Sequence, residues 1–308
     1  MAVPEVGISI SSSPDADPVA EARHAEALGF DVVTVHRDVL HGPPPSLEMW
    51  TLLTWIAART TTVRLAPNVL ALPNRHPAVL AKMAETLDRL AGGRLILALG
   101  GGAAINREAF GALGLAQRSA RETVAATEEA IEVIRGLWRQ PGFSHPGDHF
   151  TTRAADLQPR PARPIPIWLG AFGPRMLDLV GRQADGWLPS LFLLEPEQAY
   201  RSLDRVRRAA SRAGRDPEGL VYGYNVGVLV REGAASTRGL VAGGPEEVAG
   251  QLAGFARGGF SFLNLSPAGD GAEQRERLAQ EVLPVLRAGW STPVQRGLHV
   301  ADRGTQPD

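Results

Sequence analysis

The chain has 308 residues, a length that one large domain or two ordinary domains can fill. Its formal net charge is -1 and both signs are spread along the chain, which excludes an electrostatic footprint for nucleic acid or an anionic membrane. There is no cysteine, so disulfides, thiol catalysis and thiolate metal ligands are excluded as well. We therefore expect a small-molecule partner. The first 18 residues lack the basic flank and apolar core of a signal peptide or a membrane span, so we expect a cytoplasmic protein.

Short runs rich in Val, Ile and Leu alternate with longer segments of helical period, which is the pattern of repeated βα units on a parallel sheet. Eight strands are predicted, at 6–10, 31–36, 63–72, 94–100, 165–171, 186–190, 220–230 and 262–266. A helix is predicted after each strand, at 18–28, 47–58, 77–90, 118–139, 174–183, 196–213, 245–257 and 272–287. Several helices have a start signal, at Pro18, Pro77, Pro196 and Pro245.

Eight such units predict an α/β fold of the (β/α)8 TIM-barrel class, since right-handed crossovers close the repeat into a barrel. We expect a single domain over 1–290, with a Pro- and Gly-rich insertion at 140–164 between the fourth helix and the fifth strand. Residues 291–308 lack periodicity and are predicted to be an irregular C-terminal tail. A doubly wound dinucleotide-binding sheet is disfavoured because its glycine fingerprint belongs after the first strand, where this chain reads SSSPDADP.

Functional candidates follow from position, because the active site of a TIM barrel lies at the carboxyl ends of the strands. Polar residues and glycines at the predicted strand exits are Ser9, Ser11, His36, Arg37, Asp38, Asn68, Gly100, Gly101, Gly102, Asn106, Gly170, Gly173, Ser190, Asn225, Asn264 and Ser266, and Trp187 lies on the sixth strand.

Two of these exits are rich in glycine. IPIWLGAFGPRM, at 165–176, brings backbone close to a ligand and leads into a helix N-terminus, which suits a phosphate; the alternative is a tight βα turn. LALGGGAAINRE, at 97–108, lets a flat ring approach the barrel mouth, or forms only a flexible turn.

VHRDVLHG, at 35–42, gathers an imidazole, a guanidinium and a carboxylate at the exit of the second strand. His36 is a candidate acid or oxyanion donor, because its ordinary pKa lies near physiological pH. The alternative is a structural ion pair between Arg37 and Asp38 with a passive histidine. No HExxH, CxxC or acidic triad is present, so no metal site is predicted.

Four blocks taken together resemble the bacterial luciferase-like family: EALGFDVVTV at 26–35 and the longer blocks at 67–102, 163–189 and 243–265. This family comprises TIM-barrel oxidoreductases that depend on FMN or on the deazaflavin coenzyme F420. The resemblance covers about residues 5 to 287 and implies a reduced cofactor at the barrel mouth, with its ring over strands two to four. It also implies a non-proline cis peptide at Asn68–Val69.

The resemblance further implies a phosphate bound by backbone N–H groups after the fifth strand. The cofactor-binding residues that we expect are Asn68, Val69, Gly100, Gly101, Gly102, Gly170, Ala171, Phe172, Gly173 and Trp187. For catalysis we expect His36 beside the reacting atom, with Asp38 and Asn106 next.

Three departures from the family pattern stand out. Deazaflavin-dependent dehydrogenases of the family typically read Asp-His where this chain has Arg37 and Asp38, and often carry Glu at the position of Ala103, which disfavours the sugar-phosphate dehydrogenases. The segment between Val230 and Pro245 is also short. It predicts a more open mouth, or a lid borrowed from 140–164 or another subunit.

Two oxidoreductase functions stay open at this point. With FMN the reaction is monooxygenation of a small organic substrate, and with F420 it is hydride transfer to or from carbon. A flavin-binding protein without turnover is the alternative from another class. A TIM-barrel hydrolase or aldolase is disfavoured, because this chain has neither a suitably placed lysine nor a carboxylate pair. Leu188, Trp187 and Phe172 suggest an apolar substrate pocket. A separate flavin or F420 reductase and a homodimer are expected partners of such an enzyme.

Overall fold

The computed structural model describes residues 3–36, 38, 44–102, 107–115 and 117–291. Three residues discussed above, Arg37, Ala103 and Asn106, lie outside this part of the chain, as do residues 292–308. The domain boundary at residue 290 and the tail beyond it therefore stay predictions. Within the described residues, no helix is both long and apolar enough to cross a membrane.

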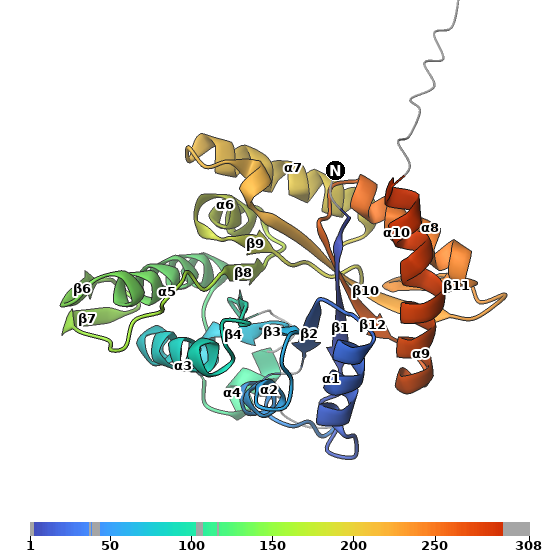
Figure 1. Ribbon diagram of the computed structural model, residues 1–308. Coiled ribbons are helices and arrows are strands. Elements are labelled where there is room, and N and C mark those ends of the chain that lie inside the picture. The colour runs from blue at the N-terminus through green and yellow to red at the C-terminus, as the bar shows by residue number, and fades with distance from the viewer. Residues whose placement is uncertain (1–2, 37, 39–43, 103–106, 116, 292–308) are drawn as a thin grey trace, which may run out of the picture.

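The strands of the central parallel sheet form a nearly closed barrel (Figure 1). They are β1 (Glu5–Ile10), β2 (Val32–Val35), β3 (Arg64–Pro67), β4 (Leu70–Ala71), β5 (Leu97–Gly100), β8 (Ile167–Gly170), β9 (Gly186–Trp187), β10 (Val221–Val230) and β12 (Phe262–Pro267). Their order round the barrel is β3-β2-β1-β12-β10-β9-β8-β5-β4.

β3 and β4 are two parts of one run, residues 64–71, and this run closes the ring. β3 pairs with β2 and β4 pairs with β5, so the first and last strands of the sheet belong to the same segment. A parallel bridge between Leu65 and Leu95 adds to the closure. The predicted (β/α)8 barrel is thereby confirmed, with the third predicted strand divided in two.

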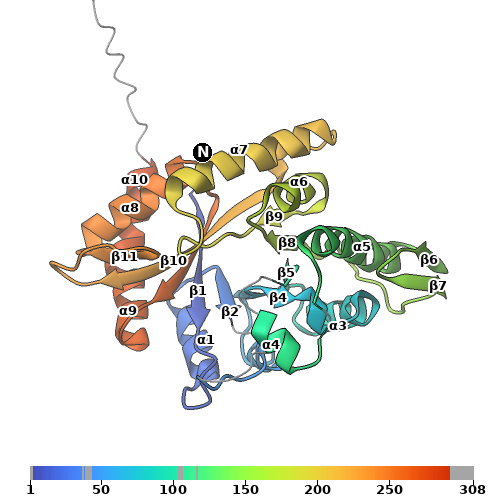
Figure 2. The same cartoon turned by 180° about the vertical axis from the view of Figure 1, so that it is seen from behind.

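Helices surround this barrel, as the two opposite views in Figures 1 and 2 show. They are α1 (Pro18–Ala27), α2 (Met49–Ala57), α3 (Pro77–Leu90), α4 (Arg107–Ala112), α5 (Ala120–Arg139), α6 (Pro174–Gln183), α7 (Pro196–Arg212), α8 (Pro245–Arg257), α9 (Gly271–Arg277) and α10 (Leu283–Ser291). Short 3-10 turns lie at Leu72–Asn74 and Pro217–Gly219, and a π-helical turn, Leu278–Val282, joins α9 to α10.

The start signals in the sequence are confirmed, because each of the four marked prolines is the first residue of its helix. α5 begins two residues later than predicted, because Ser119 and Glu122 form a reciprocal capping box there. The last predicted helix, 272–287, is divided into α9, the π turn and α10.

The insertion at 140–164 contains an antiparallel hairpin that the sequence analysis did not predict, β6 (Phe143–Pro146) and β7 (Thr151–Ala155). It packs along α5, where the Glu129 carboxylate accepts the backbone N–H groups of three hairpin residues, Asp148, His149 and Phe150. Its prolines and glycines conceal the short strands, since four or five residues show little alternation. β11 (Leu240–Gly243), parallel to the end of β10, was missed for the same reason.

Two separate groups of buried side chains follow from the alternation of side chains along barrel strands. The larger group fills the space between sheet and helices, and it includes Trp187. The smaller group fills the barrel interior: Val32, Ala66, Ile96, Ala98, Trp168, Leu188 and Phe262. The rings of Trp168 and Phe262 lie 5.2 Å apart there. This plug closes the barrel below and leaves the carboxyl ends of the strands as the place for a ligand.

Candidate active site

A cavity of about 1090 Å³ lies at the carboxyl ends of the strands. Ligand pockets generally measure about 300–1,000 Å³, so this one has room for a cofactor and a substrate. Its wall comes from the exits of β2, β5, β8, β10 and β12, from residues 68–73 and from the start of α5. The predicted site residues that line it are His36, Asp38, Asn68, Val69, Gly100, Gly101, Gly102, Gly170, Ala171, Phe172 and Gly173.

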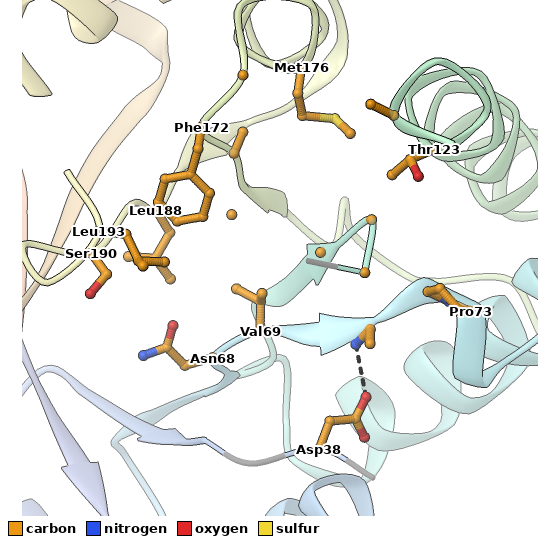
Figure 3. A pocket seen from close by; sticks show the side chains of 18 of the residues that line it. Asp38, Asn68, Val69, Pro73, Thr123, Phe172, Met176, Leu188, Ser190 and Leu193 are labelled. Carbon is orange, nitrogen blue, oxygen red and sulfur yellow. Dashed lines mark hydrogen bonds between the residues drawn. The ribbon is translucent and has the colours of Figure 1, made fainter. Parts of the chain in front are cut away.

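The floor of the cavity is shaped by Val69, which follows the cis peptide Asn68–Val69 that the sequence analysis predicted. Figure 3 shows the side chain of Val69 in this cavity, and two glycines, Gly100 and Gly170, lie next to it. A Cβ on Gly100 would lie 2.8 Å from Val69 Cγ2, and a Cβ on Gly170 would lie 3.1 Å from the same atom. A side chain at Gly100 would displace the valine and one at Gly170 would crowd it, so the two glycines leave an apolar platform against which a flat ring can lie.

The glycine loop after β8 leads directly into α6, as expected for a phosphate site. Gly173 is the N-cap of α6 and Pro174 is its first residue, so no side chain caps the free N–H groups of the first turn. A Cβ on Gly173 would meet no atom within 4 Å, which means that the loop borders open space. Free N–H groups and the positive end of the helix dipole favour an anion at this point.

Charge in the cavity wall favours an anion as well. Arg118, just before α5, and Arg175, in the first turn of α6, both line the cavity. Among the described lining residues the one carboxylate is Asp38, and its charge is paired with Arg75. The wall is therefore positive overall, which attracts a negatively charged ligand.

The second glycine loop packs tightly and is less open than the first. A Cβ on Gly101 would lie 2.6 Å from Thr123 Cγ2 and 3.2 Å from Met176 Cε, so α5 and α6 both approach this backbone. Gly102 has a φ of +91° and faces Pro73 at 2.9 Å from its hypothetical Cβ. The packing of the fold itself requires glycine in this loop, whether or not a ligand contacts it.

His36 lies at the exit of β2, is partly buried and lines the cavity. An imidazole in this place can donate or accept a proton on a ligand in the barrel mouth. Its predicted catalytic role stays a prediction, as does that of Asn106, which lies outside the described residues.

Asp38 also lines the cavity, but its carboxylate is engaged by neighbouring groups. Oδ2 accepts the backbone N–H of Ala71 and the side-chain amide of Asn74, both at 2.8 Å, and Arg75 Nη1 lies 3.1 Å from Oδ1. Among the described residues the ion-pair partner of Asp38 is Arg75. The alternative pair of Asp38 with Arg37 stays a prediction, because Arg37 lies outside the described residues. This geometry favours a positioning role, in which Asp38 holds the segment that follows Val69.

Arg75 extends this group of charges outward to Glu48, with which it forms a second ion pair. Glu48 caps α2, where its carboxylate accepts the N–H groups of Trp50 and Thr51. Burial alone would raise the pKa of Glu48, but hydrogen bonds from Thr51 and Trp50 and the charge of Arg75 outweigh it, so the pKa lies below its ordinary value. Glu48 therefore stays ionised and helps to hold Arg75 beside Asp38.

The prediction that Trp187 contacts the cofactor is wrong in this structure. The Trp187 side chain is fully buried between sheet and helices, stacks on Phe260 and does not line the cavity. Side chains alternate along a strand, so its neighbour Leu188 points into the barrel instead. Trp187 affects the site indirectly, because its Nε1–H donates to the carbonyl of Ala171 at 3.0 Å and holds the glycine loop in place.

The described residues of the insertion 140–164 do not line the cavity. A lid built from this segment therefore has no support in the structure. Within the described ranges, no group of three or more His, Asp or Glu side chains is placed to hold a metal ion.

A network of polar side chains lies at the base of the cavity and was not recognised from sequence. Its members are Ser9, Thr34, Asn68, Asn225, Asn264 and Ser266, five of which were candidates as separate strand exits. Thr34 was missed because it lies inside the apolar run VVTV. Its polar side chain at an inward position of a buried strand was the available signal.

The fold and the site together define a (β/α)8 barrel whose mouth holds a glycine loop at a helix N-terminus and an apolar platform at Val69. The family model described as luciferase-like monooxygenase matches residues 7–242, and the chain belongs to this family.

Curated relatives of known activity match part of the chain. A phthiodiolone/phenolphthiodiolone dimycocerosates ketoreductase of Mycobacterium sp. (strain JLS) is 41% identical over 177 residues, which cover 56% of this chain and 45% of that protein. An F420-dependent glucose-6-phosphate dehydrogenase of Kineococcus radiotolerans is 35% identical over 173 residues, or 54% of this chain and 50% of that one. The chain spans about half the length of the curated relatives it matches.

Solved structures share the fold over nearly the whole chain. An F420-dependent secondary alcohol dehydrogenase in complex with an F420-acetone adduct superimposes with a TM-score of 0.83 and 20% identity, covering 93% of this chain and 100% of that one. The EDTA monooxygenase of Chelativorans sp. BNC1 superimposes with a TM-score of 0.80 and 14% identity, covering 95% of each chain. At these identities the likeness shows the fold alone.

Proposed function

We propose that this protein is an oxidoreductase that binds the reduced deazaflavin F420 at the barrel mouth and transfers hydride between it and a carbon atom of a small organic substrate. The observation that carries the proposal is one continuous cavity in which the Val69 platform leads to the glycine loop and the bare N-terminus of α6. A flat ring with a phosphate on its side chain matches this order of features.

The cofactor class is supported by charge and by the relatives. F420 carries anionic groups beyond its phosphate, and Arg118 and Arg175 provide two cations in the cavity wall. The matched relatives include a ketoreductase and an F420-dependent dehydrogenase. Reduced FMN with monooxygenation is the second candidate, supported by the family to which the chain belongs and by a monooxygenase of the same fold.

Each group of residues has a separate task in this proposal. When bound, the deazaflavin supplies the centre that gives or takes hydride. Backbone N–H groups of 170–173 and of the first turn of α6 bind the phosphate, while Val69 with Gly100, Gly101 and Gly102 supports the ring. His36 gives a proton to the substrate oxygen when a carbonyl is reduced, and takes it back in the opposite direction. Asp38 keeps the segment after Val69 in place.

The direct test is anaerobic titration of the apoprotein with F420, FMN and reduced FMN, followed by fluorescence and absorbance. Binding of F420 with clear preference supports the proposal. A preference for reduced FMN supports the monooxygenase candidate, and binding of none refutes the cofactor assignment. If a cofactor binds but separate assays find neither hydride transfer with alcohols or ketones nor oxygen-dependent turnover, a flavin-binding protein is supported.

Glycine variants connect this titration to the loop. Gly173→Ala adds a methyl group to open space at the proposed phosphate site, and Gly254→Ala is the matched control, since its Cβ also meets no atom within 4 Å but lies on α8. We expect the first to weaken cofactor binding by about tenfold or more, which corresponds to about 1.4 kcal/mol, and the second to leave it unchanged.

Three further expectations belong to the same proposal: a cytoplasmic location, a separate reductase that regenerates the reduced cofactor, and a homodimer. Size-exclusion chromatography with light scattering tests the dimer directly.

A further inference from the structure

The hydrogen bonds of the polar network at the base of the cavity fix the orientation of its amide side chains, and the last of these amides lines the cavity. Asn225 on β10 is its centre: its Oδ1 accepts from Asn68 Nδ2 at 2.7 Å and from Asn264 Nδ2 at 2.8 Å, and its Nδ2 donates to the carbonyl of Pro189 at 3.1 Å. The side chains involved come from separate strands, so the barrel brings them together only when it closes.

The backbone carbonyl of Pro189 sets the orientation of Asn225. A carbonyl can only accept, so the amide nitrogen of Asn225 must face it and the amide oxygen must face the opposite way. Rotating the amide by half a turn would put two oxygens at hydrogen-bond distance, and would present a nitrogen to Asn68 and Asn264. Side-chain amides are assigned from such constraints, and here the constraint is a main-chain atom.

Asn264 is oriented next, and its hydrogen-bonding groups are all used. Its Nδ2 donates to Asn225 and to Ser9 Oγ, the latter at 3.1 Å, while its Oδ1 accepts the hydroxyl of Thr34 at 3.1 Å. Asn264 and Thr34 are fully buried, where an unmade hydrogen bond is costly. The network therefore has no spare donor on this side that would let Asn225 turn.

Asn68 is the end of the network at the cavity. Its Nδ2 is turned to Asn225, and no donor among the described residues reaches its Oδ1. The residue lines the cavity, and Figure 3 shows its side chain reaching upward beside Val69 and below Ser190. An amide oxygen held in this way is an acceptor of fixed direction at the edge of the ring platform.

We propose that Asn68 Oδ1 accepts a hydrogen bond from an N–H or O–H group of the bound ligand, and that Asn225 is the positioning residue that keeps this oxygen turned to the cavity. The inference rests on the proposed function and adds a determinant of specificity to it. Two sources have the required chemistry, a ring N–H of the cofactor and the hydroxyl of an alcohol substrate. A ketone has no such donor, so the second source would make the site discriminate alcohol from ketone.

The experiment is a double-mutant cycle with Asn68→Ala, Asn225→Ala and the double variant, each titrated with F420 without substrate and then assayed with a secondary alcohol and its ketone. If the donor belongs to the cofactor, both single variants weaken F420 binding about tenfold and the double variant is no worse than either, since the two residues act through one contact. If it belongs to the alcohol, F420 binding is unchanged and KM rises about tenfold for the alcohol only. In either case a shared, non-additive effect supports the proposal.

A structural role alone would give a different result. Additive effects, or an Asn68→Ala variant that keeps both F420 affinity and alcohol KM within twofold of wild type, would overturn the proposal. Asn225→Ser serves if Asn225→Ala does not fold, and urea denaturation of the apoproteins measures the coupling of Asn68 with Asn225 without any ligand. Wild-type protein that binds neither cofactor would refute the proposed function, whereas absent coupling in urea would refute the positioning role independently.

Discussion

Asp38→Asn separates a positioning role for this carboxylate from a catalytic one. The side chains of Asp38 and Arg75 are 7% and 13% exposed, so their ion pair is poorly screened by solvent. Asparagine removes the charge that faces Arg75. The asparagine also has only one oxygen to accept the hydrogen bonds that the two carboxylate oxygens of Asp38 accept now. Its amide nitrogen, which cannot accept, would face one of these donors. Breaking a buried pair on one side typically costs about 3–5 kcal/mol.

The expected cost here is smaller than that range, because Arg75 keeps its second partner Glu48. We expect Asp38→Asn to lower the free energy of unfolding by about 2–3 kcal/mol, which for a domain of this size corresponds to a Tm lower by roughly 3–5 °C. Urea denaturation followed by circular dichroism measures this change, and cofactor titration of the folded variant shows whether the segment after Val69 has moved.

Asp204→Asn is the matched control, since Asp204 lies on an exposed position of α7 and the same substitution there should change stability by no more than about 0.5 kcal/mol. The positioning argument fails if Asp38→Asn is as stable as wild type and binds cofactor normally but has lost turnover. That result would assign Asp38 to the reacting group, as first expected from its place after the second strand.

Three other variants test separate parts of the structure. Gly101→Ala should lower stability by about 1–3 kcal/mol through overpacking, because its Cβ would lie 2.6 Å from Thr123 Cγ2, and an unchanged urea midpoint would contradict the tight packing of that loop. Tyr224→Phe should cost about 1–2 kcal/mol, since it leaves the carbonyl of Leu194 without its donor while the ring still stacks on Phe260; a loss of more than about 3 kcal/mol would mean that the ring stack had moved. Glu26 accepts three backbone N–H groups that outweigh the opposing effect of burial and lower its pKa from 4.5 to about 2. A lowered folded-state pKa stabilises the fold above pH 4.5, so Glu26→Gln should be less stable than wild type at pH 7 by about 1–2 kcal/mol after allowance for solvent screening, and the difference should shrink as the pH falls from 4.5 toward 2. A difference that is constant between pH 7 and 3 would contradict this assignment.

The sequence by itself determined the barrel, because the signals for it are local. Apolar runs of strand length, helical periods and prolines at helix starts each depend on a few consecutive residues, and eight repeats of them allow little besides a closed parallel sheet. The glycine loop at 170–173 was also readable from sequence, since glycines between a strand and a helix have a mechanism of their own.

The tertiary structure decided which way each side chain faces and what it touches. Trp187 and Leu188 are neighbours in sequence, yet alternation along the strand places the first in the outer core and the second in the barrel. Asp38 acquired Arg75 as a partner from a loop 37 residues away. In the network of Asn68, Asn225 and Asn264, the hydrogen bond between Asn68 and Asn225 joins residues 157 positions apart. Contacts of this kind depend on how the barrel closes, and no short stretch of sequence records that closure.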